Sequence, residues 1–314
     1  MQIFSEFVTI KEQYKNIAVA LGTFDGVHLG HQRIICRAVE LARANAGTSA
    51  VLTFRNHPLS VIAPAAEPLQ VGDLLSRRRL LASLGVDVLI ELPFTAEFAK
   101  VTAAAFVQLL HERLAPAWLV VGPDYSFGYR GEGNTACLQQ AGAQYGMQTE
   151  VCAPVLYGGE AVRSTRIRSL LAAGELALVN ELLGRPFTFS GPVVHGDERG
   201  RTLGFPTANL VIGAQRAMLP NGAYAVTVQY GGRSWFGVAN VGSNPTFGAV
   251  QRRLEVHVLD FHGDLYGQDI QVQFLARLRA EQKFASAAAL VGQLQVDVRE
   301  ARKIFSLQGL APVI

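Results

Sequence analysis

The stretch Ile17–Ala42 reads I-A-V-A-L-G-T-F-D-G-V-H-L-G-H-Q-R-I-I-C-R-A-V-E-L-A and contains three elements in a fixed order. Ile17–Leu21 is a short apolar run, which predicts a buried strand. Gly22–His31 is a glycine-rich loop, and the apolar residues after it recur at helical spacing. This order places the free N–H groups of a helix start at the loop, which favours an anion there. The stretch therefore predicts an α/β unit that carries a phosphate site.

Strands and helices continue to alternate through the first half of the chain. Short apolar runs predict strands at Ala50–Phe54, Val86–Leu92 and Trp118–Val121. Helical spacing predicts helices at Arg77–Leu84, Ala103–Leu114 and Ser164–Leu171, the last with Ser164 or Thr165 as N-cap. Strands that alternate with helices are typical of a parallel, doubly wound sheet.

The pattern changes near Gly184-Arg185-Pro186. Short strands separated by Gly, Pro and Asn are predicted at Ala223–Gln229, Ser234–Val241, Leu254–Phe261 and Asp269–Phe274. Their spacing favours a small antiparallel β-barrel. A helix from about Ser286 follows, with apolar residues on one face. We therefore predict two domains, 1–184 and 185–314.

Composition limits the classes of function. The 314 residues are 49% apolar and 17% charged, with a net charge of +3, which gives no support for a nucleic-acid surface. The three cysteines form no C-x-x-C pair, which is typical of reduced thiols in the cytoplasm. No apolar run is long enough to cross a membrane. We expect a cytoplasmic monomer or weak homo-oligomer that binds small molecules and neither nucleic acid nor membranes.

The loop Gly22–His31 offers specific phosphate ligands. Gly22, Gly26 and Gly30 allow a phosphate to approach the backbone, and His28 and His31 can donate to its oxygens. The loop lacks the G-K-[ST] of a P-loop and the G-x-G-x-x-G of a dinucleotide fold. The alternative is a tight turn with incidental surface histidines.

A second basic segment, V-R-S-T-R-I-R, covers Val162–Arg168. Ser164 and Thr165 offer hydroxyls at a helix start, and Arg168 can pair a phosphate bidentately. On these residues alone, capping of a surface helix is the simpler interpretation.

The second half carries another glycine-rich loop, G-D-E-R-G-R-T-L-G-F-P-T-A-N, from Gly196 to Asn209. Thr207 and Asn209 are two residues apart, so on an extended segment both point to one face. Their oxygens suit Mg²⁺ bound with a nucleotide, although a simple hairpin would also explain the turn. Glu255 alternates with apolar residues and can serve as a general base or can face water.

In the first half, H-x-G-H and S-T-x-I-R resemble the nucleotidyltransferase superfamily. T-F-R-N-H-P (Thr53–Pro58) and G-P-D-Y-S-F-G (Gly122–Gly128) are similar to the adenylyltransferase module of bacterial bifunctional riboflavin kinase/FAD synthetases. The resemblance implies a nucleotidyltransferase-type α/β domain in which the FMN phosphate attacks the α-phosphorus of ATP. It implies that His28, His31 and Arg168 are catalytic and stabilise the transferring and leaving phosphates. It also implies ATP or phosphate contacts at Gly22, Phe24, Asp25, His28, Gly30, His31, Ser164, Thr165 and Arg168, with His57, Asp124 and Phe127 on the flavin/ATP side.

In the second half, G-R-x-L-G-F-P-T-A-N, N-P-T-F, E-V-H-x-L-D-F, D-L-Y-G and R-x-E-x-K-F resemble the riboflavin kinase module of the same family. The resemblance implies that Thr207 and Asn209 bind Mg²⁺ with ATP and that Glu255 is the base toward the ribityl 5′-hydroxyl. It implies phosphate contacts at Gly196, Gly200, Arg201 and Gly204, and flavin contacts at Arg279 and Phe284.

The first half departs from the family pattern. Thr23 stands where Asn is usual, and Tyr125 and Ser126 stand where Phe and Arg are usual. The resemblance predicts a bifunctional enzyme that uses ATP and Mg²⁺ to convert riboflavin to FMN and FMN to FAD. The departures keep a second interpretation open, a monofunctional kinase with a degenerate nucleotide-binding N-terminal domain. A non-catalytic flavin-binding protein is a third.

Overall fold

The computed structural model describes residues 1–196, 200, 203–246 and 249–307. The chain folds into two compact units. The first contains Met1–Pro68 and Leu74–Ser164, and the second contains Leu69–Asp73 and Thr165–Ile314. The domain boundary between residues 184 and 185 stays a prediction. Within the described ranges, no helix is both long enough and apolar enough to cross a membrane.

The first unit is built on a six-stranded parallel sheet with the order β1-β4-β3-β2-β5-β6. Its strands are β1 (Gln2–Phe4), β2 (Ala18–Leu21), β3 (Ser49–Phe54), β4 (Val88–Leu92), β5 (Trp118–Val121) and β6 (Gln148–Val151). The order reverses between β2 and β5, and ligands of open α/β sheets bind at such a switch point, outside the carboxyl ends of the strands. The loop that begins at Gly22 leaves β2 at this position.

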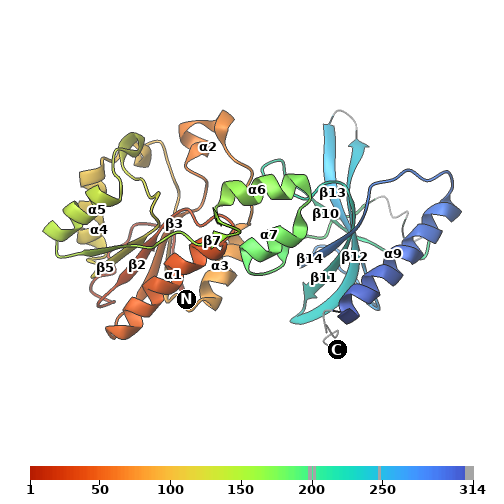
Figure 1. Ribbon diagram of the computed structural model, residues 1–314, viewed down its shortest axis with the longest axis horizontal. Coiled ribbons are helices and arrows are strands. Elements are labelled where there is room, and N and C mark those ends of the chain that lie inside the picture. The colour runs from red at the N-terminus through yellow and green to blue at the C-terminus, as the bar shows by residue number, and fades with distance from the viewer. Residues whose placement is uncertain (197–199, 201–202, 247–248, 308–314) are drawn as a thin grey trace. The chain divides into compact units, whose positions relative to one another are not determined.

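Helices cover both faces of this sheet (Figure 1). The helical segments are α1 (Leu29–Ala44), α2 (Leu59–Ile62), η1 (Pro64–Ala66), α3 (Leu74–Ser83), η2 (Phe98–Lys100), α4 (Ala103–Arg113), η3 (Tyr129–Gly131) and α5 (Thr135–Gln144), and a small hairpin joins β7 (Leu156–Tyr157) to β8 (Glu160–Ala161). Alternate residues of β2 serve opposite faces: Ala18 and Ala20 pack with α1 and α3, and Val19 and Leu21 pack with α4 and α5. The predicted doubly wound α/β architecture is confirmed.

The second unit is a nearly closed antiparallel barrel. Its elements are α6 (Ser164–Ala173, whose first residue belongs to the first unit), α7 (Leu176–Leu183), β9 (Phe187–Pro192), β10 (Ala208–Val211), β11 (Gly222–Tyr230), β12 (Arg233–Thr246), β13 (Ala249–Val258), β14 (Asp269–Ala280) and α9 (Ala287–Leu307). The strand order is β10-β13-β12-β11-β14-β9. An antiparallel bridge from Val194, just after β9, to Asn209 in β10 brings the two edges together. The predicted barrel is therefore confirmed.

The terminal helix α9 packs on the outside of the barrel strands. Ala301 and Phe305 are buried, and the Phe305 ring stacks on Phe236 of β12 with centroids 4.1 Å apart. These contacts confirm the predicted helix and its apolar face.

A substitution on α9 is expected to stabilise the protein. Gly292 lies on this helix, and an added Cβ would meet nothing within 4 Å. Gly292→Ala should therefore raise the free energy of unfolding by about 0.5–1 kcal/mol, because alanine loses less backbone entropy in a helix. Urea unfolding of the full chain measures this. Gly142→Ala in α5 is the contrast, since its Cβ would lie 3.1 Å from the Met147 carbonyl oxygen. Equal stabilisation by both substitutions would contradict the explanation.

Candidate active sites

The loop after β2 has an unusual backbone. Phe24 and Val27 adopt positive φ values of 50° and 40°, and Gly26 adopts 80°. A positive φ is costly for a β-branched residue such as Val27. Such a backbone persists only where its surroundings hold it in place.

Side chains donate hydrogen bonds to three carbonyl groups of this loop, those of Thr23, Asp25 and Val27. Ser164 Oγ donates to the Asp25 oxygen at 3.0 Å, and Gln32 Nε2 donates to the Val27 oxygen at 2.9 Å. The Thr23 oxygen accepts from Thr53 Oγ1 at 3.0 Å and from Arg77 Nη1 at 3.1 Å. Ser164 thus contacts the loop backbone, and its role in phosphate binding stays a prediction.

The two histidines meet at the N-terminus of α1. His28 is the N-cap, and its Nδ1 accepts the His31 backbone N–H at 3.3 Å. The imidazole rings stack with centroids 3.6 Å apart, and His28 is buried. Both rings therefore lie where the free N–H groups and the positive end of the helix dipole favour an anion.

Glycine is required at Gly22 and Gly30 by the protein itself. A Cβ on Gly22 would lie 2.9 Å from the Phe24 ring, and one on Gly30 would lie 3.0 Å from the Val162 oxygen and 3.1 Å from the His28 ring. Phe24 is 1% exposed and meets His31 edge-on at 5.3 Å. The buried Phe24 ring therefore packs against the His31 ring. Asp25 is also buried.

The three residues predicted on the flavin/ATP side of the adenylyl-transfer site have different environments. His57 Nδ1 accepts the Leu59 backbone N–H at 3.2 Å, at the start of α2. Asp124 pairs with Arg163 at 2.8 Å, and both side chains are exposed. Phe127 is a core residue, stacked on Tyr125 with centroids 5.6 Å apart. Burial raises the pKa of the Tyr125 phenol above its ordinary value.

Thr165 and Arg168 group with the second unit. Arg168 Nε donates to the Leu69 carbonyl oxygen at 2.7 Å. Their roles in phosphate binding remain predictions.

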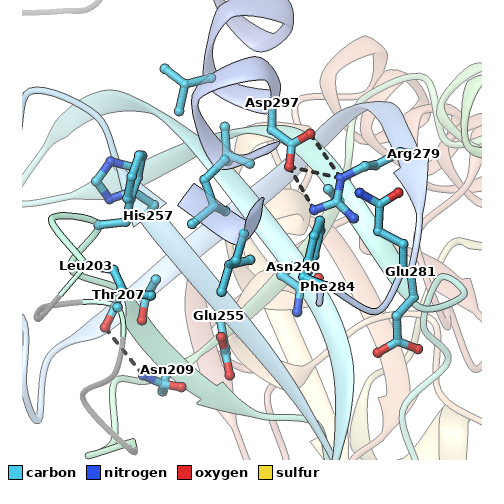
Figure 2. A pocket seen from close by; sticks show the side chains of 18 residues that line it. Leu203, Thr207, Asn209, Asn240, Glu255, His257, Arg279, Glu281, Phe284 and Asp297 are labelled. Carbon is cyan, nitrogen blue, oxygen red and sulfur yellow. Dashed lines mark hydrogen bonds and ion pairs between the residues drawn. The ribbon is translucent and has the colours of Figure 1, made fainter. Parts of the chain in front are cut away.

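In the second unit, a cavity of about 310 Å³ opens on the barrel (Figure 2). Its lining contains most of the residues predicted for the second site. These are Gly200, Thr207, Asn209, Glu255, Arg279 and Phe284. The structure therefore brings together residues that are far apart in the sequence, from Gly200 to Phe284.

The polar side chains of this cavity form a row across adjacent strands. Strand register places Asn209 opposite Glu255, Glu255 opposite Asn240, Asn240 opposite Ala223 and Ala223 opposite Arg279. All five line the cavity, and Figure 2 shows Glu255 between Asn209 and Asn240. Directly opposed residues have Cβ atoms about 4.5–5.5 Å apart, so Asn209 and Asn240 are the cross-strand neighbours of Glu255 on its two sides.

Described residues of the glycine-rich segment, among them Gly200, Thr207 and Asn209, lie at one end of the row. Asn209 Nδ2 donates to the Thr207 carbonyl oxygen at 3.3 Å. A Cβ on Gly196 would lie 2.5 Å from Asn209 Nδ2, and one on Gly200 would overlap the Phe205 carbonyl oxygen. Gly204 has a φ of +82°. Arg201 lies outside the described residues.

The other end of the row contains an ion pair. Asp297 of α9 is 3% exposed and accepts from Arg279 Nε at 3.0 Å and from Arg279 Nη2 at 2.8 Å. The Arg279 guanidinium lies over the Phe284 ring, 5.6 Å from its centroid. These contacts hold Arg279 and Phe284 together as one wall of the cavity.

Sequence reasoning missed Asn240 and Asp297. Asn240 becomes visible only through the register that sets it opposite Glu255. Asp297 could have been found from the sequence, because it is a charged residue on the apolar face of α9, two helical turns after Leu290. A carboxylate on a buried face needs a partner.

Comparisons with known proteins identify a family for each half of the chain. The family model for FAD synthetase matches residues 10–166, and the model for riboflavin kinase matches residues 183–305. A protein of Escherichia coli K12 named bifunctional riboflavin kinase/FMN adenylyltransferase is 40% identical, covering 92% of this chain and 93% of its own length. The Bacillus subtilis protein of the same name is 35% identical, covering 95% of each chain.

One solved structure matches nearly the whole chain. It is described as a macrolide-efflux protein from Streptococcus pneumoniae, with a TM-score of 0.83 and 32% identity over 96% of this chain and 99% of its own. That name differs from those of the other relatives, so we conclude from this match only that the two chains share a fold. With both family models matched in order, the chain belongs to the bifunctional riboflavin kinase/FMN adenylyltransferase family and carries both of its transferase activities.

Proposed function

We propose that the barrel cavity is the riboflavin kinase site and that Glu255 is its general base. The observation that carries this proposal is the row Asn209–Glu255–Asn240–Ala223–Arg279. Glu255 is one strand away from Asn209 and three strands away from Arg279. The base therefore lies beside the proposed metal and phosphate end, and the flavin ring extends toward Arg279 and Phe284.

In this reaction, the ribityl 5′-hydroxyl attacks the γ-phosphorus of ATP and ADP leaves. Glu255 accepts the hydroxyl proton as the O–P bond forms. Asn209 and Asn240 flank the carboxylate and can orient it, since each amide carries donors. Phosphoryl transfer needs mainly positioning and charge stabilisation, which a cavity lined by fixed polar groups supplies.

Thr207 and Asn209 are the residues that would hold Mg²⁺ with ATP. The donor set fits, because the Thr207 hydroxyl and the Asn209 amide oxygen are hard oxygens of the kind Mg²⁺ prefers. The close approach of Gly196 to the Asn209 amide shows that this corner has no room for a larger loop residue. When bound, the metal neutralises developing phosphate charge.

We also propose that the loop Gly22–His31 is the adenylyl-transfer site. The FMN phosphate attacks the α-phosphorus of ATP, and pyrophosphate leaves. His28, His31 and the N-terminus of α1 stabilise the negative charge by hydrogen bonding and position, without a covalent intermediate. The resemblance adds Thr165 and Arg168 as phosphate ligands.

Replacing Asn209 by alanine tests the kinase assignment. Asn209→Ala should lower FMN formation from riboflavin about 10–100-fold and raise the Mg²⁺ concentration needed for half-maximal rate. Chromatography of the flavins formed with Mg-ATP and either riboflavin or FMN measures both steps. FAD formation from supplied FMN should be unchanged, and it is the internal control. Equal losses of the two steps would overturn the assignment of Asn209 to the kinase.

The predicted location and assembly are proposals of the same kind. Cys36, Cys137 and Cys152 are free, and burial raises the pKa of the Cys36 and Cys152 thiols. These features support the expectation of a reducing, cytoplasmic setting. A monomer or weak homo-oligomer stays a prediction, which sedimentation velocity tests.

A further inference from the structure

A buried carboxylate in the first unit lies beneath the proposed adenylyl-transfer loop. Glu91 is on β4 and is 0% exposed. Its Oε1 accepts from Arg77 Nη2 at 2.9 Å, and its Oε2 accepts from Arg78 Nε at 3.1 Å. Both arginines come from α3. Two cations on one buried carboxylate are a costly arrangement, and it calls for an explanation beyond stability.

Arg77 continues from Glu91 to two backbone carbonyls. Its Nη1 donates to the Thr23 oxygen at 3.1 Å, and its Nη2 donates to the Phe54 oxygen at 2.7 Å. Thr23 follows β2, and Phe54 is the last residue of β3. One guanidinium therefore links the carboxyl ends of two neighbouring strands.

Each of these carbonyls begins a segment of the proposed site. Thr23 directly precedes Phe24, where the positive-φ part of the loop begins and leads to His28 and His31. Phe54 leads to His57 at the start of α2. A strained loop keeps its geometry only where surrounding contacts fix it.

We propose that Arg77, anchored by Glu91, is a positioning residue for adenylyl transfer. It holds the Thr23 and Phe54 carbonyl groups at a fixed separation. The loop after β2, which carries His28 and His31, therefore keeps its position relative to the segment after β3, which carries His57. The planar guanidinium suits this task, because its donors point in fixed directions to separate acceptors. A lysine ammonium is a single point of charge and cannot reproduce that fork. The proposal rests on the proposed adenylyl-transfer site.

Arg78 provides a matched control on the same helix. It donates to the same carboxylate, but in the described part of the chain no hydrogen bond joins it to the Thr23 or Phe54 carbonyl. Arg77→Lys and Arg78→Lys both keep a positive charge beside Glu91. They differ in the loss of the two carbonyl contacts, which only Arg77 makes.

The experiment measures kcat and KM for FMN adenylylation in full-length R77K, R78K and H28A. R77K should lower kcat by about tenfold or more, with a smaller change in KM, because small misplacements of reacting groups are costly. R78K should stay within about twofold of the unsubstituted enzyme in kcat. Riboflavin phosphorylation by the same molecules and their thermal unfolding report whether the chain is intact.

Three results would overturn the proposal. One is an R77K enzyme with unchanged kcat. Another is an equal loss in R77K and R78K that follows a lowered unfolding temperature, which would make both ion pairs structural only. The third is a change in KM alone. H28A separates this proposal from the site assignment: normal FAD formation by H28A would reject the site itself, whatever the result for R77K.

Discussion

Replacing Glu255 by glutamine is expected to slow riboflavin phosphorylation by about 10²–10⁴-fold. Glutamine keeps the size and the hydrogen-bonding shape of the side chain but cannot accept the proton of the ribityl hydroxyl. Because Glu255 lies between Asn209 and Asn240 in the strand register, the substitution should leave the row in place. The loss should therefore fall on kcat and only slightly on KM for riboflavin.

Three measurements support this test. Adenylylation of supplied FMN should proceed at the normal rate, since the loop Gly22–His31 belongs to the first unit. Glu300→Gln, an exposed acid on α9 paired with Lys303, should leave phosphorylation unchanged. Glu255→Ala should be at least as slow as Glu255→Gln. Near-normal phosphorylation in either Glu255 variant would show that another group accepts the proton.

The elements predicted correctly are those with a strong local pattern. β2, β3, β4 and β5 are mostly apolar and almost fully buried, so their short apolar runs are sufficient to predict them. β6 (Gln148–Val151) was missed because it is a polar strand at the sheet edge. An edge strand is held by pairing with one neighbour, and its own composition does not reveal that pairing.

Strand ends in the barrel were set by tertiary contacts. The strand predicted to run to Phe261 ends at Val258, and Asp260 adopts a φ of +58° that no strand continues through. The strand predicted to end at Phe274 continues to Ala280, with irregular register against β11 near Tyr224. Its final residues include Arg277, which donates to the Asn221 carbonyl oxygen, and Arg279, which lines the cavity.

The site residues divide in the same way. His28, His31, Thr207, Asn209 and Glu255 lie in local motifs, so their types and spacing were readable from the sequence. Arg77 acts through backbone carbonyls, and Glu91 lies inside an apolar run, so neither forms a motif. Their relation depends on which strands are neighbours in the sheet, and no local pattern contains that information.

Substitution of His28 is expected to reduce FAD formation from FMN by about 10²–10³-fold, the typical effect of removing a preorganised donor from a charge-stabilising site. FMN formation from riboflavin should remain normal. His28 also caps α1, however, through the hydrogen bond from the His31 N–H to its Nδ1. Loss of an N-cap by itself costs about 1 kcal/mol of stability, so alanine would remove two functions at once.

Asparagine separates the two functions of His28. It is among the best N-cap residues, so His28→Asn keeps the cap of α1 while it removes the imidazole that stacks on His31. If the imidazole stabilises the transferring phosphate, His28→Asn and His28→Ala should lose FAD formation to a similar extent, although only the alanine variant unfolds earlier. His111→Ala, which removes a ring stacked on Tyr145 elsewhere in the first unit, should retain the activity. A normal rate in His28→Asn together with a low rate in His28→Ala would make His28 a cap alone. His31 and the N-terminus of α1 would then be the groups that stabilise the negative charge of the transferring phosphate.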